Sequence, residues 1–274
     1  MDAQLARPLP ENDSTRRNDR GYFIVVEGID GIGKTTVAAE VMTLLHDRGV
    51  GFCGRKTIGR THPFVEREMA TLARLLWGGG DGHADHLFPV HYWIHLQSAW
   101  YAAFSNIVLA PLLDRGVTAI VDGWFYKLLA RQLIRGMDRD YLQAIFAHLP
   151  KPDRVFLLRG NVAQIWSRRG DFKRHELGLH AGYGTLSVAS FLDYQSRTQD
   201  ELARLAVEHD WVVIDVPAGE TSAETAARIA AHVTELLERA VTRGAAGIGP
   251  LRGTHAPAHP REVFRLARES ATPR

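Results

Sequence analysis

The segment that most constrains this chain is residues 21–36, in which an apolar run leads directly into a glycine-rich turn. The turn reads Gly28-Ile-Asp-Gly-Ile-Gly-Lys-Thr35, which is the G-x-x-x-x-G-K-[ST] pattern of a phosphate-binding loop. Glycines at this spacing leave backbone amides free to surround an anion, and the helix that follows adds the positive end of its dipole. The segment therefore predicts a strand, a phosphate-binding loop and a helix, with a nucleoside triphosphate as the ligand.

The last residues of this loop have separate expected roles in binding the nucleotide. Lys34 is placed to reach the β- and γ-phosphates, and the Thr35 hydroxyl is placed to coordinate a magnesium ion that bridges them. We expect ATP and Mg²⁺ as cofactors. The predicted nucleotide-binding residues are Gly28, Ile29, Asp30, Gly31, Ile32, Gly33, Lys34, Thr35 and Thr36.

A second acidic residue, Asp122, ends a later apolar run. In that place a carboxylate can hold the magnesium shell through water, or accept a proton from an acceptor hydroxyl. The alternative is a simple cap at the end of a strand. We take Asp122 as a candidate catalytic residue. Asp122 and Thr35 are the two predicted metal ligands.

Length and charge limit the remaining possibilities. With 274 residues, 45% of them hydrophobic, the chain can bury the core of one α/β domain and still carry tails. Its formal charge of +2 creates no strong field, so we expect neither a nucleic acid polymer nor a membrane as partner. The one cysteine, Cys53, and an N-terminus without the apolar core of a signal peptide favour a cytoplasmic protein.

Hydrophobic patterning predicts five short strands separated by helices. We expect strands at 23–27, 50–53, 117–122, 154–158 and 211–215, and helices at 34–47, 64–77, 91–114, 126–147, 161–169, 185–207 and 222–239. This alternation predicts an α/β fold with a five-stranded parallel sheet and helices on both faces. Ligands then bind at the carboxyl ends of the strands.

Several of these segments resemble one known family. Residues 23–36, Phe-Ile-Val-Val-Glu-Gly-Ile-Asp-Gly-Ile-Gly-Lys-Thr-Thr, closely resemble the opening of bacterial thymidylate kinases. Residues 111–122, 151–158 and 211–215 are similar to later strands of that family, and residues 167–174 to its lid. The resemblance implies a P-loop kinase fold with a short Arg-rich lid, phosphoryl transfer from MgATP to a nucleotide acceptor, and a homodimer.

On this basis the chain divides into three parts. We expect a flexible N-terminal arm at 1–20, a P-loop kinase domain at 21–240 with its lid at about 168–184, and a flexible C-terminal tail at 241–274.

The resemblance also implies where catalysis and acceptor binding take place. The variable positions of the P-loop, residues 29–32, hold no basic side chain, so only the lid-type arrangement of the family fits, with Arg168 and Arg169 as catalytic residues beside Lys34. The alternative for these arginines is a solvated helix end. Asp30 resembles the carboxylate with which the family contacts the acceptor sugar, and the alternative is an Asp that only forms the turn. Arg55 follows the second strand, where the family carries an arginine that binds the acceptor's phosphate.

The sequence departs from the family on the acceptor side. After the third strand the family reads Asp-Arg-aromatic, whereas this chain has Gly123 in place of the arginine, and Lys127 or Arg131 is the candidate replacement. The segment 86–104 is rich in aromatic residues, which suit either a flat base or an ordinary core or dimer seam. The predicted acceptor-binding residues are Asp30, Arg55, Gln97, Trp124 and Tyr126.

The leading interpretation is ATP-dependent phosphoryl transfer to a nucleoside monophosphate. One alternative is a family member that phosphorylates a nucleoside or another small-molecule hydroxyl, because one expected arginine is missing. A second alternative is a non-catalytic protein that binds ATP as a regulatory ligand.

Overall fold

The computed structural model describes residues 20–54, 63–77, 88–179 and 181–247. Five parallel strands form one sheet in the order β2-β3-β1-β4-β5. The strands are β1 (Phe23–Glu27), β2 (Val50–Cys53), β3 (Thr118–Asp122), β4 (Arg154–Gly160) and β5 (Val212–Val216). The predicted five-stranded parallel sheet is confirmed.

The central strand β1 explains why the P-loop is so firmly placed. All five residues of β1 are buried, since the strand pairs with β3 on one side and β4 on the other and is covered on both faces. Its register sets Val26 beside Asp122 and Glu27 beside Leu157. The acidic ends of β1 and β3 therefore meet at the same edge of the sheet.

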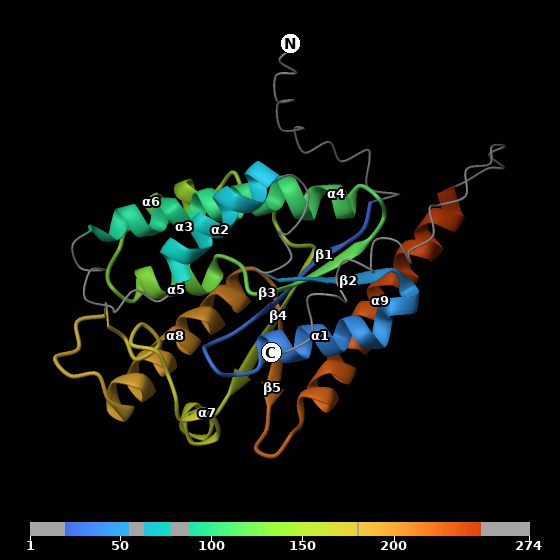
Figure 1. Ribbon diagram of the computed structural model, residues 1–274. Helices are drawn as coiled ribbons and strands as arrows, with labels where there is room; N and C mark the ends of the chain where they lie inside the picture. Colours follow the sequence, from blue (N-terminus) through green and yellow to red (C-terminus); the bar gives the residue numbers. More distant parts are fainter. Residues whose placement is uncertain (1–19, 55–62, 78–87, 180, 248–274) are drawn as a thin grey trace, which may run out of the picture.

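Two sets of helices cover the two faces of the sheet (Figure 1). The helices α1 (Lys34–Leu45) and α9 (Ser222–Gly247) pack together on one face, and α3 (Val90–Phe104), α5 (Tyr126–Leu133), α6 (Arg139–Phe146) and α8 (Val188–Glu208) cover the other. The chain crosses from β1 to β2 in one direction and makes its other three crossovers in the opposite direction. Right-handed crossovers therefore require α1 on one face and the later connecting helices on the other.

The remaining helices extend these layers. The helix α2 (Pro63–Trp77) packs on α3, and α7 (Val162–Arg169) packs on α8. A π-helical turn, η5 (Ser105–Leu109), joins α3 to α4 (Ala110–Leu113), and a 3₁₀ turn, η2 (His46–Arg48), follows α1. No helix in the described ranges combines the length and the hydropathy needed to cross a bilayer.

The single helix predicted at 126–147 is wrong, because the structure divides it into α5 and α6. Gly136 has a φ of 82°, which turns the chain between them. The Asp138 side chain then caps α6 by accepting a hydrogen bond from the Tyr141 amide at 2.7 Å. At the other end of the chain, α9 continues to Gly247, past residue 241 at which we expect the tail to begin.

Candidate active site

A cavity of about 1140 Å³ lies at the carboxyl ends of β1 and β3. The P-loop and Asp122 form its floor, α3 and α5 form one wall, and the segment after α7 forms another. It continues from the predicted phosphate-binding residues to a wall of aromatic side chains on α3. One space therefore connects the predicted nucleotide site with the predicted acceptor site.

The P-loop offers this cavity its backbone rather than its apolar side chains. Ile29 and Ile32 belong to the hydrophobic core and are buried beneath the loop. The Lys34 ammonium group donates hydrogen bonds to the carbonyl oxygens of Gly28 at 2.8 Å and Ile29 at 2.7 Å. Burial and, to a smaller extent, the nearby positive charge of Lys127 lower the pKa of Lys34 to about 7, although Asp30, Glu27 and Asp122 act in the opposite direction.

Thr35 and Asp122 meet across the sheet edge. The Thr35 hydroxyl donates a hydrogen bond to Asp122 Oδ2 at 2.6 Å. A hydroxyl and a carboxylate are the hard oxygen ligands that Mg²⁺ prefers, so this pair fits the ion. No group of three or more His, Cys, Asp or Glu side chains within the described ranges could hold a metal by itself, so water or phosphate oxygens would complete the coordination.

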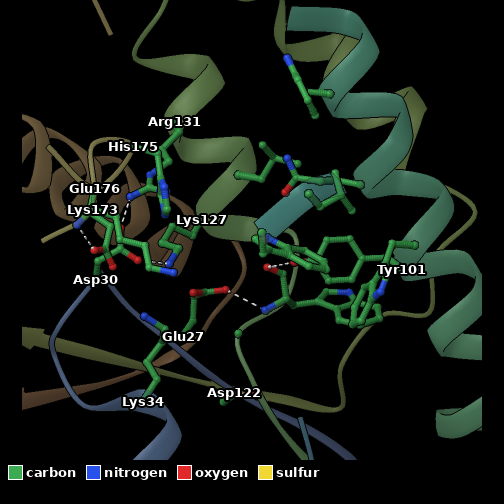
Figure 2. Close-up of a pocket in the computed structure, with 18 of the residues that line it drawn as sticks. Glu27, Asp30, Lys34, Tyr101, Asp122, Lys127, Arg131, Lys173, His175 and Glu176 are labelled. Carbon is green, nitrogen blue, oxygen red and sulfur yellow. Dashed lines mark hydrogen bonds and ion pairs between the residues drawn. The ribbon is translucent and has the colours of Figure 1, made fainter. Parts of the chain in front are cut away.

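Asp30 lies at the centre of a buried cluster of charges (Figure 2). Its two carboxylate oxygens form ion pairs with Lys127 and Arg131, which project from successive turns of α5. Gln195 of α8 accepts from the Asp30 amide and donates to its carboxylate, both at 3.3 Å. Burial raises the pKa of the Asp30 carboxyl, but the charges of Arg131, Lys127 and Lys34 outweigh it and hold that pKa well below its usual range.

The start of the predicted lid segment contacts the P-loop. Arg168 donates to the Gly31 carbonyl at 3.2 Å, but it does not line the cavity. Arg169 does line the cavity, where it pairs with Glu176 at 3.2 Å and lies 4.7 Å from the Phe172 ring. Of the two predicted catalytic arginines, Arg169 therefore faces the cavity and Arg168 does not, and each is held by a backbone or carboxylate partner.

The predicted acceptor residues are only partly brought together. Gln97 and Trp124 line the cavity, although Trp124 is almost fully buried and packs edge-on against Phe23 at 5.1 Å. Tyr126 is absent from the described cavity lining and packs against Trp211, with ring centroids 4.6 Å apart. Arg55 lies outside the described residues.

Comparison with known proteins decides the family. A probable thymidylate kinase of Thermococcus kodakarensis is 36% identical over 152 residues, which make up 53% of this chain and 70% of that protein. The chain belongs to the thymidylate kinase family. A probable thymidylate kinase of Pyrococcus horikoshii is 32% identical over 139 residues, or 51% of this chain and 65% of that relative. The chain thus spans slightly less than two thirds of the length of that curated relative.

Other comparisons agree with this assignment. The thymidylate kinase of Xanthomonas oryzae pv. oryzae is 32% identical over 161 residues, covering 57% of this chain and 64% of that protein. The solved thymidylate kinase of Candida albicans superposes with a TM-score of 0.55 at 19% identity, covering 82% of this chain and 93% of that chain, which supports the P-loop kinase fold. No protein-family model matches the chain.

Two residues of this thymidylate kinase family member line or support the site although the sequence reasoning gave them no role in it. Glu27 is fully buried and accepts hydrogen bonds from the Gly28 amide at 3.0 Å and the Trp124 amide at 3.1 Å, so it joins the P-loop to the end of β3. Its place as the last residue of a buried strand was the available signal. Gln195 lies in the middle of an amphipathic helix, where no local pattern distinguishes it.

Proposed function

We propose that this protein transfers the γ-phosphoryl group of ATP to a nucleoside monophosphate, with thymidylate as the first candidate acceptor. The observation that carries the proposal is one continuous cavity faced by Lys34, by the Thr35–Asp122 pair and by Arg169 of the lid. In-line phosphoryl transfer needs alignment and neutralisation of the charge on the moving oxygens, and these groups suit that task. Membership of the thymidylate kinase family supports the same reaction.

Each residue that faces the cavity would have a separate role in the transfer. Lys34 exchanges its carbonyl partners for the β- and γ-phosphates, and the P-loop amides surround the same anion. A bound Mg²⁺ would supply positive charge that neutralises part of the phosphate charge. Thr35 and Asp122 would hold that ion, directly or through water. Arg169 would approach the transferring group from the predicted lid segment.

The charge of the cavity favours an acceptor that already carries a phosphate. Seven Lys and Arg residues line it against four Asp and Glu residues. A neutral hydroxyl acceptor would leave part of this positive charge without a counterion, whereas a monophosphate supplies one. The lining cations are Lys34, Lys127, Arg131, Arg135, Arg169, Lys173 and Arg174.

Two broader expectations also remain proposals. The first is a homodimer, which the family resemblance implies and which light scattering in solution tests. The second is a cytoplasmic location, which the buried thiol of Cys53, the one cysteine of the sequence, supports.

The test of the proposed function is ADP release with MgATP against a panel of dTMP, dUMP, other nucleoside monophosphates and the matching nucleosides. We expect turnover on monophosphates and none on nucleosides. Turnover on a nucleoside alone would replace the acceptor class with a hydroxyl. ATP binding without ADP release on any acceptor would instead support a regulatory role.

A further inference from the structure

We propose that Lys127 and Arg131 of α5 bind the phosphate of the monophosphorylated acceptor, and that Asp30 and Gln195 are positioning residues that hold these two cations at the cavity wall. This inference rests on the proposed function, and it assigns the acceptor's phosphate to two cations of one helix. Gly123 stands where the resemblance leads one to expect an arginine.

The first step is that the Asp30 carboxylate already has its partners. One oxygen pairs with Lys127, and the other pairs with Arg131 and accepts from Gln195. The side chain is only 11% exposed. A carboxylate occupied in this way orients its partners and has little capacity left for a substrate hydroxyl.

The second step is that the two cations retain unused donors. Lys127 can donate three hydrogen bonds and Arg131 five, yet each makes a single hydrogen bond, to Asp30, among the described residues. Both side chains line the cavity, with exposed fractions of 23% and 15%. With one carboxylate between them, the group carries a net positive charge that faces the cavity.

The third step is the location of these cations. Figure 2 shows Lys127 between Asp30 and Glu27, with Lys34 approaching from the P-loop side. Lys127 and Lys34 line the same cavity, and the positive charge of Lys127 acts on Lys34. An anion placed between two such ammonium groups relieves their repulsion. The acceptor's phosphate must lie beside the γ-phosphate for in-line transfer, and Lys127 lines the same cavity as the P-loop lysine.

Arg131 also contacts the neighbouring helix α8. Its guanidinium lies 5.1 Å from the Tyr194 ring on α8, and that ring also lines the cavity. Gln195, the next residue along α8, is fully buried and also donates to the Glu176 carbonyl at 2.7 Å. Through Gln195, the cation pair is tied to both the P-loop and the lid.

The experiment is calorimetric titration of dTMP and of thymidine into the full chain with a non-hydrolysable MgATP analogue present. We expect Lys127→Met and Arg131→Met each to weaken dTMP binding by about tenfold to a hundredfold, the range for a lost charge-assisted hydrogen bond. Thymidine binding should change by no more than about twofold, because thymidine lacks the phosphate. Lys127→Arg should keep most of the dTMP affinity.

Two control variants separate this effect from general damage. Arg197→Met removes an arginine that donates to the Ile134 carbonyl at the end of α5 without lining the cavity, and it should leave both affinities unchanged. The test variant Gln195→Met should weaken dTMP binding when it is the only substitution. It should have no further effect when Lys127→Met is already present. Gln199→Met, which removes a partner of the Gly160 amide on the same helix, should lack this effect.

Three results would overturn the inference. They are unchanged dTMP affinity in folded Lys127→Met and Arg131→Met variants, equal losses for dTMP and thymidine, and a wild type that binds no monophosphate. If Arg131→Met does not fold, the comparison of Lys127→Met with Lys127→Arg decides. The ADP-release panel tests the proposed function separately. The titration tests only whether Lys127 and Arg131 bind the acceptor's phosphate.

Discussion

At the scale of single residues, Lys34 couples nucleotide binding to protons. Burial lowers the pKa of Lys34 to about 7, so the free protein at pH 8 carries this side chain mostly uncharged. The triphosphate favours the charged form and should restore the proton. We expect MgATP binding to take up about one proton at pH 8 and much less at pH 6. Calorimetry in buffers of different ionisation enthalpy measures this uptake.

The same shift has a defined sign for stability. An unfolded lysine keeps its proton to a higher pH than the folded one, so the contribution of Lys34 to stability is present above its unfolded pKa and is lost as pH falls toward 7.

Lys34→Met should abolish the proton uptake on MgATP binding. Equal binding enthalpy in all buffers for the wild-type protein would show that Lys34 is already charged.

Glu27 makes the strongest stability prediction at this scale. Two backbone amides donate to its two buried oxygens, and Glu27→Gln would turn one acceptor into a donor that faces an N–H group. We expect a loss of about 1–3 kcal/mol in the free energy of unfolding, measured in urea. Glu235→Gln on the exposed face of α9 should cost less than about 0.5 kcal/mol. Equal effects would contradict the role of Glu27 as a buried link.

At the scale of elements, the contact between lid and P-loop depends on a missing Cβ. Gly31 has a φ of 78°, and a Cβ there would lie 2.9 Å from both Ile165 and Phe172. Gly136, with a φ of 82°, has open space around the same position. Gly136→Ala should therefore cost only the backbone penalty of about 1 kcal/mol, whereas Gly31→Ala should cost at least about 2 kcal/mol and detach the lid.

Thermal unfolding and limited proteolysis of the two alanine variants measure this difference. Cleavage after the lid's basic residues should become faster in Gly31→Ala and stay unchanged in Gly136→Ala. Equal stability and equal cleavage would show that Phe172 moves away at no cost.

At the scale of the whole molecule, binding of MgATP in the cavity should raise the free energy of unfolding. At a concentration one hundred times its dissociation constant, a ligand adds about 2.7 kcal/mol to the free energy of unfolding. We therefore expect MgATP at that excess to raise the melting temperature by roughly 5–10 °C. Scanning calorimetry tests this expectation.

Magnesium should be necessary for the full effect. With EDTA present, ATP should produce a smaller shift, because its phosphate charge is then not neutralised. Asp122→Asn should reduce the response to magnesium while leaving the unliganded protein folded. The same shift with and without magnesium would separate Thr35 and Asp122 from metal binding.

The sequence alone determined the P-loop, the parallel sheet and the family. A loop of this kind is defined by a local spacing of glycines, Lys34 and Thr35, and buried parallel strands such as β1 are continuous apolar runs. Both signals lie within a few consecutive residues, so they can be recognised without knowledge of long-range contacts. The break at Gly136 was local too, but the apolar pattern on both sides of it concealed the turn.

Tertiary structure decided the partners of the charged groups. Asp30, Lys127 and Gln195 lie up to 165 residues apart and meet because three elements converge at one edge of the sheet. The same convergence turned Tyr126 toward Trp211, away from the cavity that takes in its neighbour Lys127. Side-chain direction on a short helix depends on which segments pack against each of its faces, and a single sequence does not identify those segments.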